Sequence, residues 1–174
     1  GVLFVHSSPR ALCPHLEWAI GSALGYPVNC RWEDQPVLPG TLRAEMEWMG
    51  PVGSGAAIAS SLRGWEHLRY EVTEEPTPGS DGGRWMHTPD LGVFFAQTDS
   101  SGNIVVPADR IRYALEVAQG NAEEISREPR VALGGAWDDE LEAFRHAGDE
   151  RPVVSRHRAR SPCRPHWARV SRIP

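Results

Sequence analysis

Residues 2–73 contain one short pattern of hydrophobic periodicity twice. Residues 2–5 form an unbroken apolar run, which indicates a buried strand, and apolar residues at helical spacing follow it. Alternation of apolar and polar residues over 28–33 indicates a second strand. The same succession of strand, helix and strand then recurs over residues 42–72. This doubling constrains the fold strongly, because each helix must bury its apolar stripe against the strands that flank it.

The order strand, helix, strand, strand, helix, strand is typical of the ferredoxin-like split β-α-β unit. We therefore expect an α+β fold with an antiparallel sheet and both helices on one face. The hydroxyls and proline of residues 7–9 predict the start of the first helix, and Gly25 predicts its end. A Gly- and Pro-rich turn over residues 50–55 opens the second helix.

The rest of the chain predicts additions to this unit. Residues 74–90 hold three prolines and three glycines, which is typical of a long and often functional loop. A hairpin with its turn at residues 99–103 follows, and then helices broken at Gly120, Pro129 and the Gly134-Gly135 pair. We expect the hairpin and two or three helices of residues 91–148 to cover the sheet face that the first two helices leave open. We therefore expect residues 1–148 to form one domain.

Charge separates the chain into an acidic body and a basic tail. Residues 1–148 hold 11 arginines and 21 acidic residues, a net of −10, whereas residues 149–174 hold 7 arginines and 2 acidic residues, a net of +5. The body therefore lacks the basic footprint of a nucleic-acid-binding protein. The tail, with Arg156, Arg158 and Arg160, is either a solvated extension or a segment that docks on an acidic surface of this chain or of a partner.

Other function classes are excluded by composition. No apolar run approaches the roughly 20 residues of a membrane span. Cys13, Cys30 and Cys163 are an odd number at no framework spacing, which predicts free thiols in a cytoplasmic protein. The chain has no lysine, which removes Schiff-base chemistry and the lysine of a phosphate-binding P-loop.

The two predicted helix starts are candidate sites for a small anionic ligand, because backbone N–H groups at a helix N-terminus bind anions. The first comprises Ser7, Ser8 and Arg10, and the second comprises Gly53, Ser54 and Gly55. Each is equally well interpreted as a simple helix cap.

The predicted loop carries a candidate interaction group of Arg84, Trp85, His87 and Asp90. Arginine and tryptophan are enriched at protein interfaces, although Trp85 could instead anchor the loop to the core. His87 or His6 could act as an acid or base in an enzyme. No catalytic triad order, nucleophile elbow or zinc-protease motif is present, and we expect neither a metal nor a cofactor.

Four segments carry a family resemblance: VHSSPRALCPHLEWAIGSALG, LPGTLRAEMEWMGPVGSGAAIASSLRGWEHLRYEVTEEP, DGGRWMHTPDLG and LGGAWDDELEAF. In this order they resemble an actinobacterial family of unknown function, domain family 3145, over about residues 2–148. The resemblance implies a small, soluble, cytoplasmic protein and brings no activity, substrate or cofactor. The tail lies outside it.

These observations favour a non-catalytic interaction or regulatory subunit of a cytoplasmic protein assembly, whose partner is another protein. A sensor that binds an anionic metabolite at a helix N-terminus is one alternative. A small enzyme that uses His87 or His6 is another.

Overall fold

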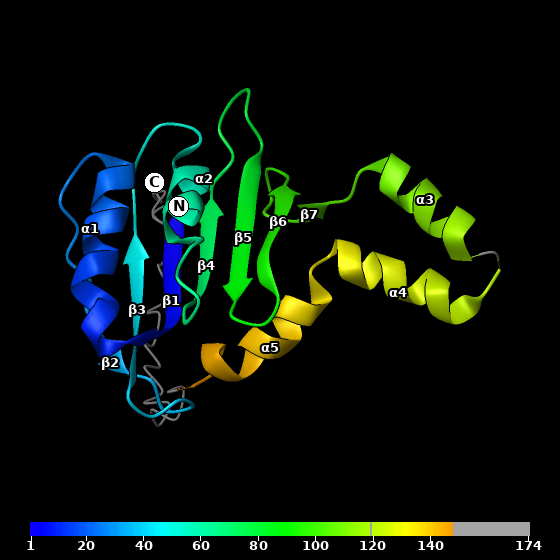
Figure 1. Ribbon diagram of the computed structural model, residues 1–174. Coiled ribbons are helices and arrows are strands. Elements are labelled where there is room, and N and C mark those ends of the chain that lie inside the picture. Colours follow the sequence, from blue (N-terminus) through cyan, green and yellow to red (C-terminus); the bar gives the residue numbers. More distant parts are fainter. Residues whose placement is uncertain (119, 148–174) are drawn as a thin grey trace, which may run out of the picture.

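One seven-stranded sheet organises the computed structural model, which describes residues 1–118 and 120–147. Within these residues all paired strands are antiparallel, in the order β2-β3-β1-β4-β5-β6-β7, and five α-helices accompany the sheet (Figure 1). The mixed α+β class is therefore confirmed. The elements are β1 (Val2–Pro9), the 3-10 helix η1 (Arg10–Leu12), α1 (Cys13–Leu24), β2 (Glu33–Asp34), β3 (Thr41–Glu47), α2 (Ser54–Leu62), β4 (Arg69–Glu74), β5 (Gly82–Thr88), β6 (Gly92–Thr98), β7 (Ile104–Val105), α3 (Ala108–Ala118), α4 (Ala122–Ala132) and α5 (Gly135–Arg145).

Strand β1 lies between β3 and β4, where Val5 is opposite Ala44 on one side and Tyr70 on the other. Alternate residues of these strands pack under α1 and α2 in the main core. Leu16 and Ile58, one from each helix, are completely buried there. Burial of a side chain of this size stabilises the fold by about 1.5–3 kcal/mol. The intervening residues of the same strands, such as Phe4 and Glu71, point to the opposite face.

The predicted start of the first helix is wrong. Strand β1 continues to Pro9, and α1 begins only at Cys13 with Pro14 in its first turn. Ser7 and Ser8 are fully buried strand residues rather than caps. The predicted strand over 28–33 is also largely absent, because only Glu33–Asp34 pairs with β3.

The predicted loop over residues 74–90 is mostly strand. β5 pairs along its whole length with β6 and over five residues with β4, so that the sheet continues beyond the doubled unit. Gly82 and Gly83 favour a loop in the sequence, but in the structure Gly83 leaves room for the Trp85 ring. A Cβ on Gly83 would lie 2.5 Å from this ring. The predicted hairpin is confirmed as β6 and β7, which are linked by a turn in which Asp99 accepts N–H bonds from Ser101 and Asn103.

The helices after the hairpin divide between two places. Leu141 of α5 packs on Met86 and Phe94 of the sheet. Helices α3 and α4 pack on each other and extend away from the sheet, and we call this pair the arm (Figure 1). The expectation that the hairpin and these helices cover the open face therefore holds for α5 alone. Strands β6 and β7 extend the sheet at its edge instead of covering it, and the arm points away from the sheet. Pro129 lies inside α4 and does not end it.

Gly134 has a φ of +80°, and a Cβ at this position would lie 2.7 Å from both Met86 and Phe94. Gly102 has a φ of +82° with nothing within 4 Å of such a Cβ. Gly102→Ala therefore costs only backbone strain, about 1–2 kcal/mol, whereas Gly134→Ala adds an overpacking cost of about 1–3 kcal/mol. Denaturant titration measures the free energy of unfolding of both variants. Equal losses of this free energy in the two variants would contradict the packing of Gly134 against Met86 and Phe94.

Candidate functional site

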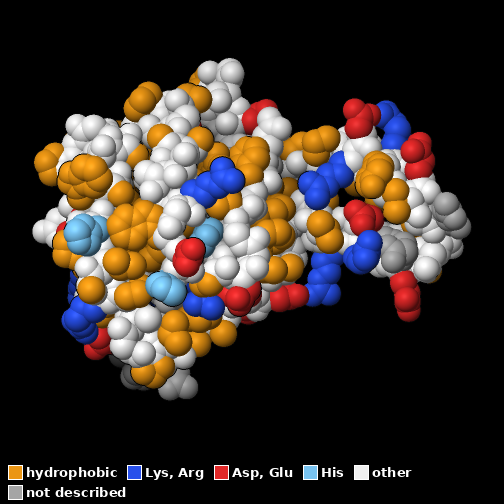
Figure 2. Space-filling view, in the orientation of Figure 1, with side chains coloured by type: hydrophobic (Ala, Val, Ile, Leu, Met, Phe, Trp, Pro, Cys, Tyr) orange, Lys and Arg blue, Asp and Glu red, His pale blue; other side chains and the backbone are white. Residues whose placement is uncertain are grey.

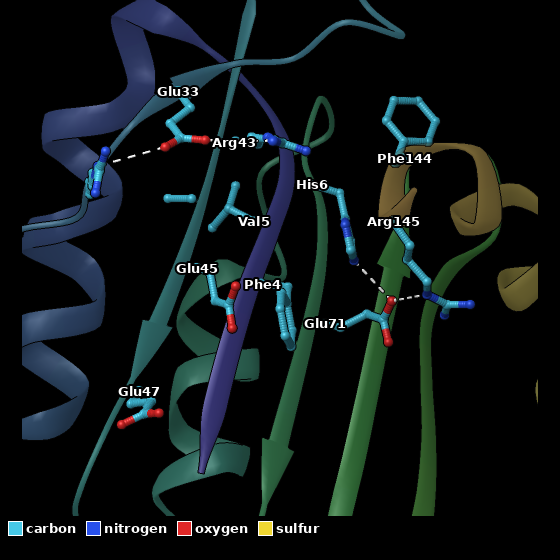
Figure 3. A pocket seen from close by; sticks show the side chains of 12 residues that line it. Phe4, Val5, His6, Glu33, Arg43, Glu45, Glu47, Glu71, Phe144 and Arg145 are labelled. Atoms are coloured by element: carbon cyan, nitrogen blue, oxygen red, sulfur yellow. Dashed lines mark hydrogen bonds and ion pairs between the residues drawn. The ribbon is translucent and has the colours of Figure 1, made fainter. Parts of the chain in front are cut away.

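A groove of about 830 Å³ lies on the sheet face opposite α1 and α2. Its floor is formed by side chains of β1, β3 and β4, and the end of α5 borders one side (Figure 3). The residues that line it are Phe4, Val5, His6, Arg31, Glu33, Arg43, Ala44, Glu45, Glu47, Glu71, Phe144 and Arg145. Polar and aromatic side chains thus converge on one concave surface, which is typical of a binding site.

The buried carboxylate of Glu71 is the centre of an ionic network beside this groove. It accepts bonds from His6 Nε2 at 2.9 Å, Arg145 Nε at 2.6 Å and Arg84 at 2.9 Å. Asp138 of α5 binds the same two arginines at 2.7 and 3.0 Å. Four chain segments therefore meet at one carboxylate: β1, β4, β5 and α5.

The network fixes the ionisation of Glu71. Burial alone would raise the pKa of its carboxyl, but the bonds from His6, Arg145 and Arg84 outweigh burial and hold that pKa far below its usual value. The same carboxylate, with Asp138, raises the pKa of Arg145. His6 is further held by stacking on Phe4, with ring centroids 6.0 Å apart, and by the Gln35 side chain, which donates to the His6 carbonyl.

The carboxylates of the groove differ in whether they are paired. Glu33 lies 3.6 Å from Arg31 and 3.5 Å from Arg43, and Glu71 is fully engaged. Glu45 and Glu47, by contrast, are exposed and form no ion pair with any residue that the structure describes. The groove therefore has two free acceptors along β3.

The first predicted anion site is not a helix N-terminus, because Ser7 and Ser8 lie in β1. The Ser8 hydroxyl donates to the Pro9 carbonyl, and Ser7 Oγ has no hydrogen-bond partner among the described residues. Arg10 pairs with Asp34 on the surface at 2.9 Å. These three residues therefore do not converge on one point, and the expectation that they begin a helix is corrected here.

The second predicted anion site is a helix N-terminus, and it already binds an anion of the chain itself. Helix α2 begins at Ser54, whose hydroxyl donates to the Pro51 carbonyl. The N–H groups of Gly53 and Gly55 donate to the two oxygens of Glu74 at 2.6 and 2.8 Å. A carboxylate is favoured at this position by the helix dipole. An external anion would have to displace Glu74.

The predicted interaction group is divided between two faces of β5. Arg84 points toward α5, where it joins the Glu71 network. Trp85 and His87 point to the opposite face, where Trp85 lies against Phe95 with ring centroids 4.9 Å apart. His87 is buried, stacks on the Tyr70 ring at 5.0 Å and donates from Nδ1 to the Leu68 carbonyl. Burial lowers the pKa of His87, and Asp90 is exposed in the turn after β5.

The remaining candidate groups are the arginines of the tail and the three cysteines. Arg156, Arg158, Arg160 and Cys163 lie outside the described residues. Cys13 and Cys30 are buried free thiols, and burial raises the pKa of Cys30 to about 11. Within residues 1–118 and 120–147, no group of His, Cys, Asp and Glu side chains could hold a metal ion. In the same part of the chain, no helix has both the length and the apolar character needed to cross a bilayer.

Sequence reasoning missed the residues that organise the groove. Glu71 lies in β4, whereas Asp138 and Arg145 lie far along the chain in α5, and none of the three belongs to a recognisable motif. The available signal was the alternation of Arg69, Glu71 and Thr73, which places charge on the side of β4 opposite its core residues.

Comparison with protein families gives one match, to the family described as "Protein of unknown function (DUF3145)", over residues 2–158. The chain belongs to this family. The family match extends ten residues beyond the predicted end at 148 and so includes Arg151, Arg156 and Arg158. Searches of curated proteins and of solved structures give no match.

Glu71→Gln removes the charge that four segments share. Breaking a buried ion pair costs about 3–5 kcal/mol, and we expect that loss in the free energy of unfolding at pH 7. Because the folded pKa of Glu71 lies below its unfolded value of about 4.3, its contribution is present above that pH and is lost as the pH falls further. Denaturant titrations between pH 7 and pH 3 measure the free energy of unfolding at each pH. As the pH falls, this free energy should decrease more steeply in the wild type than in the variant.

Glu45→Gln is the matched control, because it removes an unpaired carboxylate from the same face. Its effect should stay within about 0.5 kcal/mol. Equal losses from Glu45→Gln and Glu71→Gln would contradict the assigned network.

Glu74→Ala frees the two N–H groups at the start of α2. We expect a loss of about 0.5–2 kcal/mol of stability, as for removal of other helix caps. Millimolar sulfate should then raise the melting temperature of the variant more than that of the wild type. Glu75→Ala, which removes an exposed neighbouring carboxylate, is the control; a sulfate response equal to that of the Glu74 variant would contradict the assignment.

Proposed function

We propose that this chain is a non-catalytic interaction subunit of a larger protein assembly and that the arm formed by α3 and α4 is its docking element. The observation that carries the proposal is the set of large apolar side chains that this arm leaves exposed. Figure 2 shows hydrophobic side chains on the arm among charged ones. They are Ile111, Tyr113, Leu115 and Val117 of α3 and Ile125 and Val131 of α4.

Small residues hold the arm together while large residues point outward. Ala114 and Ala118 of α3 are buried, whereas Tyr113 is 60% and Leu115 is 56% exposed. The exposed residues lie on both flanks of the buried alanines, since successive residues are about 100° apart around a helix. Exposed apolar surface of this kind, bordered by charge, marks a protein-binding site.

Helix energetics also favour a partner. Each helix of the arm has 11 residues, and isolated helices shorter than about 12–15 residues are marginal in water. Helices in proteins gain most of their stability from packing an apolar face. Because the arm extends away from the sheet, a partner protein with an apolar surface is the natural source of that packing.

We further propose that residues 2–73 are a ferredoxin-like unit and that the protein acts in the cytoplasm of an actinobacterium. The order β2-β3-β1-β4, with α1 and α2 on one face, supports the first statement. The resemblance of the four segments supports the second.

The test is quantitative affinity purification from the native host with mass spectrometry. We compare the wild type, an arm variant with Tyr113→Gln and Leu115→Gln, and a control with Met49→Gln and Val52→Gln, which changes two exposed apolar residues outside the arm. A stoichiometric partner should be recovered with the wild type and the control and lost with the arm variant. Circular dichroism verifies that all three are folded.

Two results would overturn the proposal. One is recovery of the wild type without any stoichiometric partner. The other is retention of the same partner by the folded arm variant.

A further inference from the structure

We propose that the groove on the open sheet face binds a small guanidino acid such as L-arginine. The carboxylate of this ligand lies at Arg43, and its guanidinium group lies at Glu45 and Phe4. The volume of the groove, about 830 Å³, is within the range of about 300–1,000 Å³ that small-molecule sites have. This inference goes beyond the interaction function, because it concerns a different surface and does not involve the arm.

The charges of the groove are separated along its length. At one end Arg31 and Arg43 share the single carboxylate of Glu33, at 3.6 and 3.5 Å, so that positive charge is in excess there. At the other end Glu45 and Glu47 form no ion pair with any residue that the structure describes. In Figure 3 these two acids lie farther along β3 than Arg43. A ligand that carries both signs of charge suits such a groove, whereas an ion of one sign meets repulsion at one end.

Strand β3 sets the distance between the two ends. Arg43, Glu45 and Glu47 alternate with the buried residues Leu42 and Ala44, so that the three charged side chains leave the strand on its open face. Successive members of this row are about 6.4–6.8 Å apart along the strand. The carboxylate and the guanidinium group of one arginine molecule are separated by the length of its side chain, which is comparable. One small molecule can therefore reach Arg43 and Glu45 at the same time.

Arg43 is suited to hold the carboxylate. Its side chain is only 27% exposed, so the guanidinium group is partly fixed at the floor of the groove. Glu33, at 3.5 Å, is its sole ion-pair partner among the described residues. That contact is longer than the about 2.7–2.9 Å of a charge-assisted hydrogen bond, and a guanidinium group can bind a carboxylate through two such bonds. The ammonium group beside the ligand's carboxylate can in turn donate to Glu33.

Glu45 and Phe4 are suited to hold the guanidinium group. They lie opposite each other in the pairing of β3 with β1, so that a carboxylate and a phenyl ring are neighbours (Figure 3). A guanidinium group is planar and stacks on such a ring while it donates to the acid. An ammonium group lacks this planar fork, so the site favours arginine over lysine.

The same face already binds an arginine side chain in this way. The Arg69 guanidinium lies 4.7 Å from the centre of the Phe144 ring, and its Nε donates to Glu140 at 3.0 Å. Phe144 itself lines the groove. The chemistry that we assign to Phe4 and Glu45 therefore has a formed counterpart on the same surface.

NMR titrations of the isotope-labelled full chain with L-arginine, agmatine and L-citrulline test the assignment. Agmatine lacks the carboxylate, and citrulline has a neutral urea in place of the guanidinium group. The wild type should bind L-arginine with a dissociation constant in the millimolar range or below, and the amide signals of β1 and β3 should shift. Agmatine and citrulline should each bind at least about tenfold more weakly, because each loses one charged contact.

Two groove variants test the orientation of the ligand. Arg43→Gln should weaken binding of L-arginine at least about tenfold and leave the affinity for agmatine unchanged. A variant with Glu45→Gln and Glu47→Gln should weaken binding of L-arginine and agmatine and leave the affinity for citrulline unchanged. A general loss of structure would weaken all three ligands together, so this pattern separates binding from folding.

The matched controls remove charges of the same sign from the arm. They are Arg110→Gln, and a variant with Glu116→Gln and Glu123→Gln, all at exposed positions. Both should keep the wild-type affinity for each ligand. Three results would overturn the proposal: no saturable shift of β1 and β3 signals with L-arginine, equal affinities of the wild type for all three ligands, or unchanged binding of L-arginine by the Arg43 variant.

Discussion

The architecture depends on one buried carboxylate. Glu71 lies on β4, yet its oxygens bind a histidine of β1, an arginine of β5 and an arginine at the end of α5. A buried charge is costly unless it is fully paired, so these four segments must adopt a single arrangement for Glu71 to remain ionised. Asp138 closes the network from α5, and the doubled unit is thereby joined to the C-terminal helix.

This constraint determines which surfaces remain open. Because α5 is fixed over β5 and the edge of β4, the part of the face over β1 and β3 stays uncovered and becomes the groove. The short connection from α4 to α5, with Gly134 at a positive φ, then directs the arm away from the sheet (Figure 1). The groove offers free carboxylates and the arm offers free apolar side chains, so the two surfaces suit different ligands.

Local signals made the outline of the fold predictable, and long-range pairing made the site unpredictable. Apolar periodicity correctly predicts β1, α1, α2, β4 and the hairpin of β6 and β7, since each buries a regular stripe. It fails at β5, where glycines that accommodate the Trp85 ring resemble loop residues. The contacts of Glu71 with Arg145 and of Glu74 with Gly53 join residues 74 and 21 positions apart, and no local pattern encodes them.

A double-mutant cycle between Glu71 and Arg145 tests the central claim most directly. Unfolding free energies of the wild type, Glu71→Gln, Arg145→Gln and the double variant give the coupling between β4 and α5. If the carboxylate fixes α5 at the groove, the two losses will be non-additive by more than about 1 kcal/mol, within the range found for residues of one ionic network. Losses that add to within about 0.5 kcal/mol would show that α5 is held independently of Glu71 and would contradict this account of the groove.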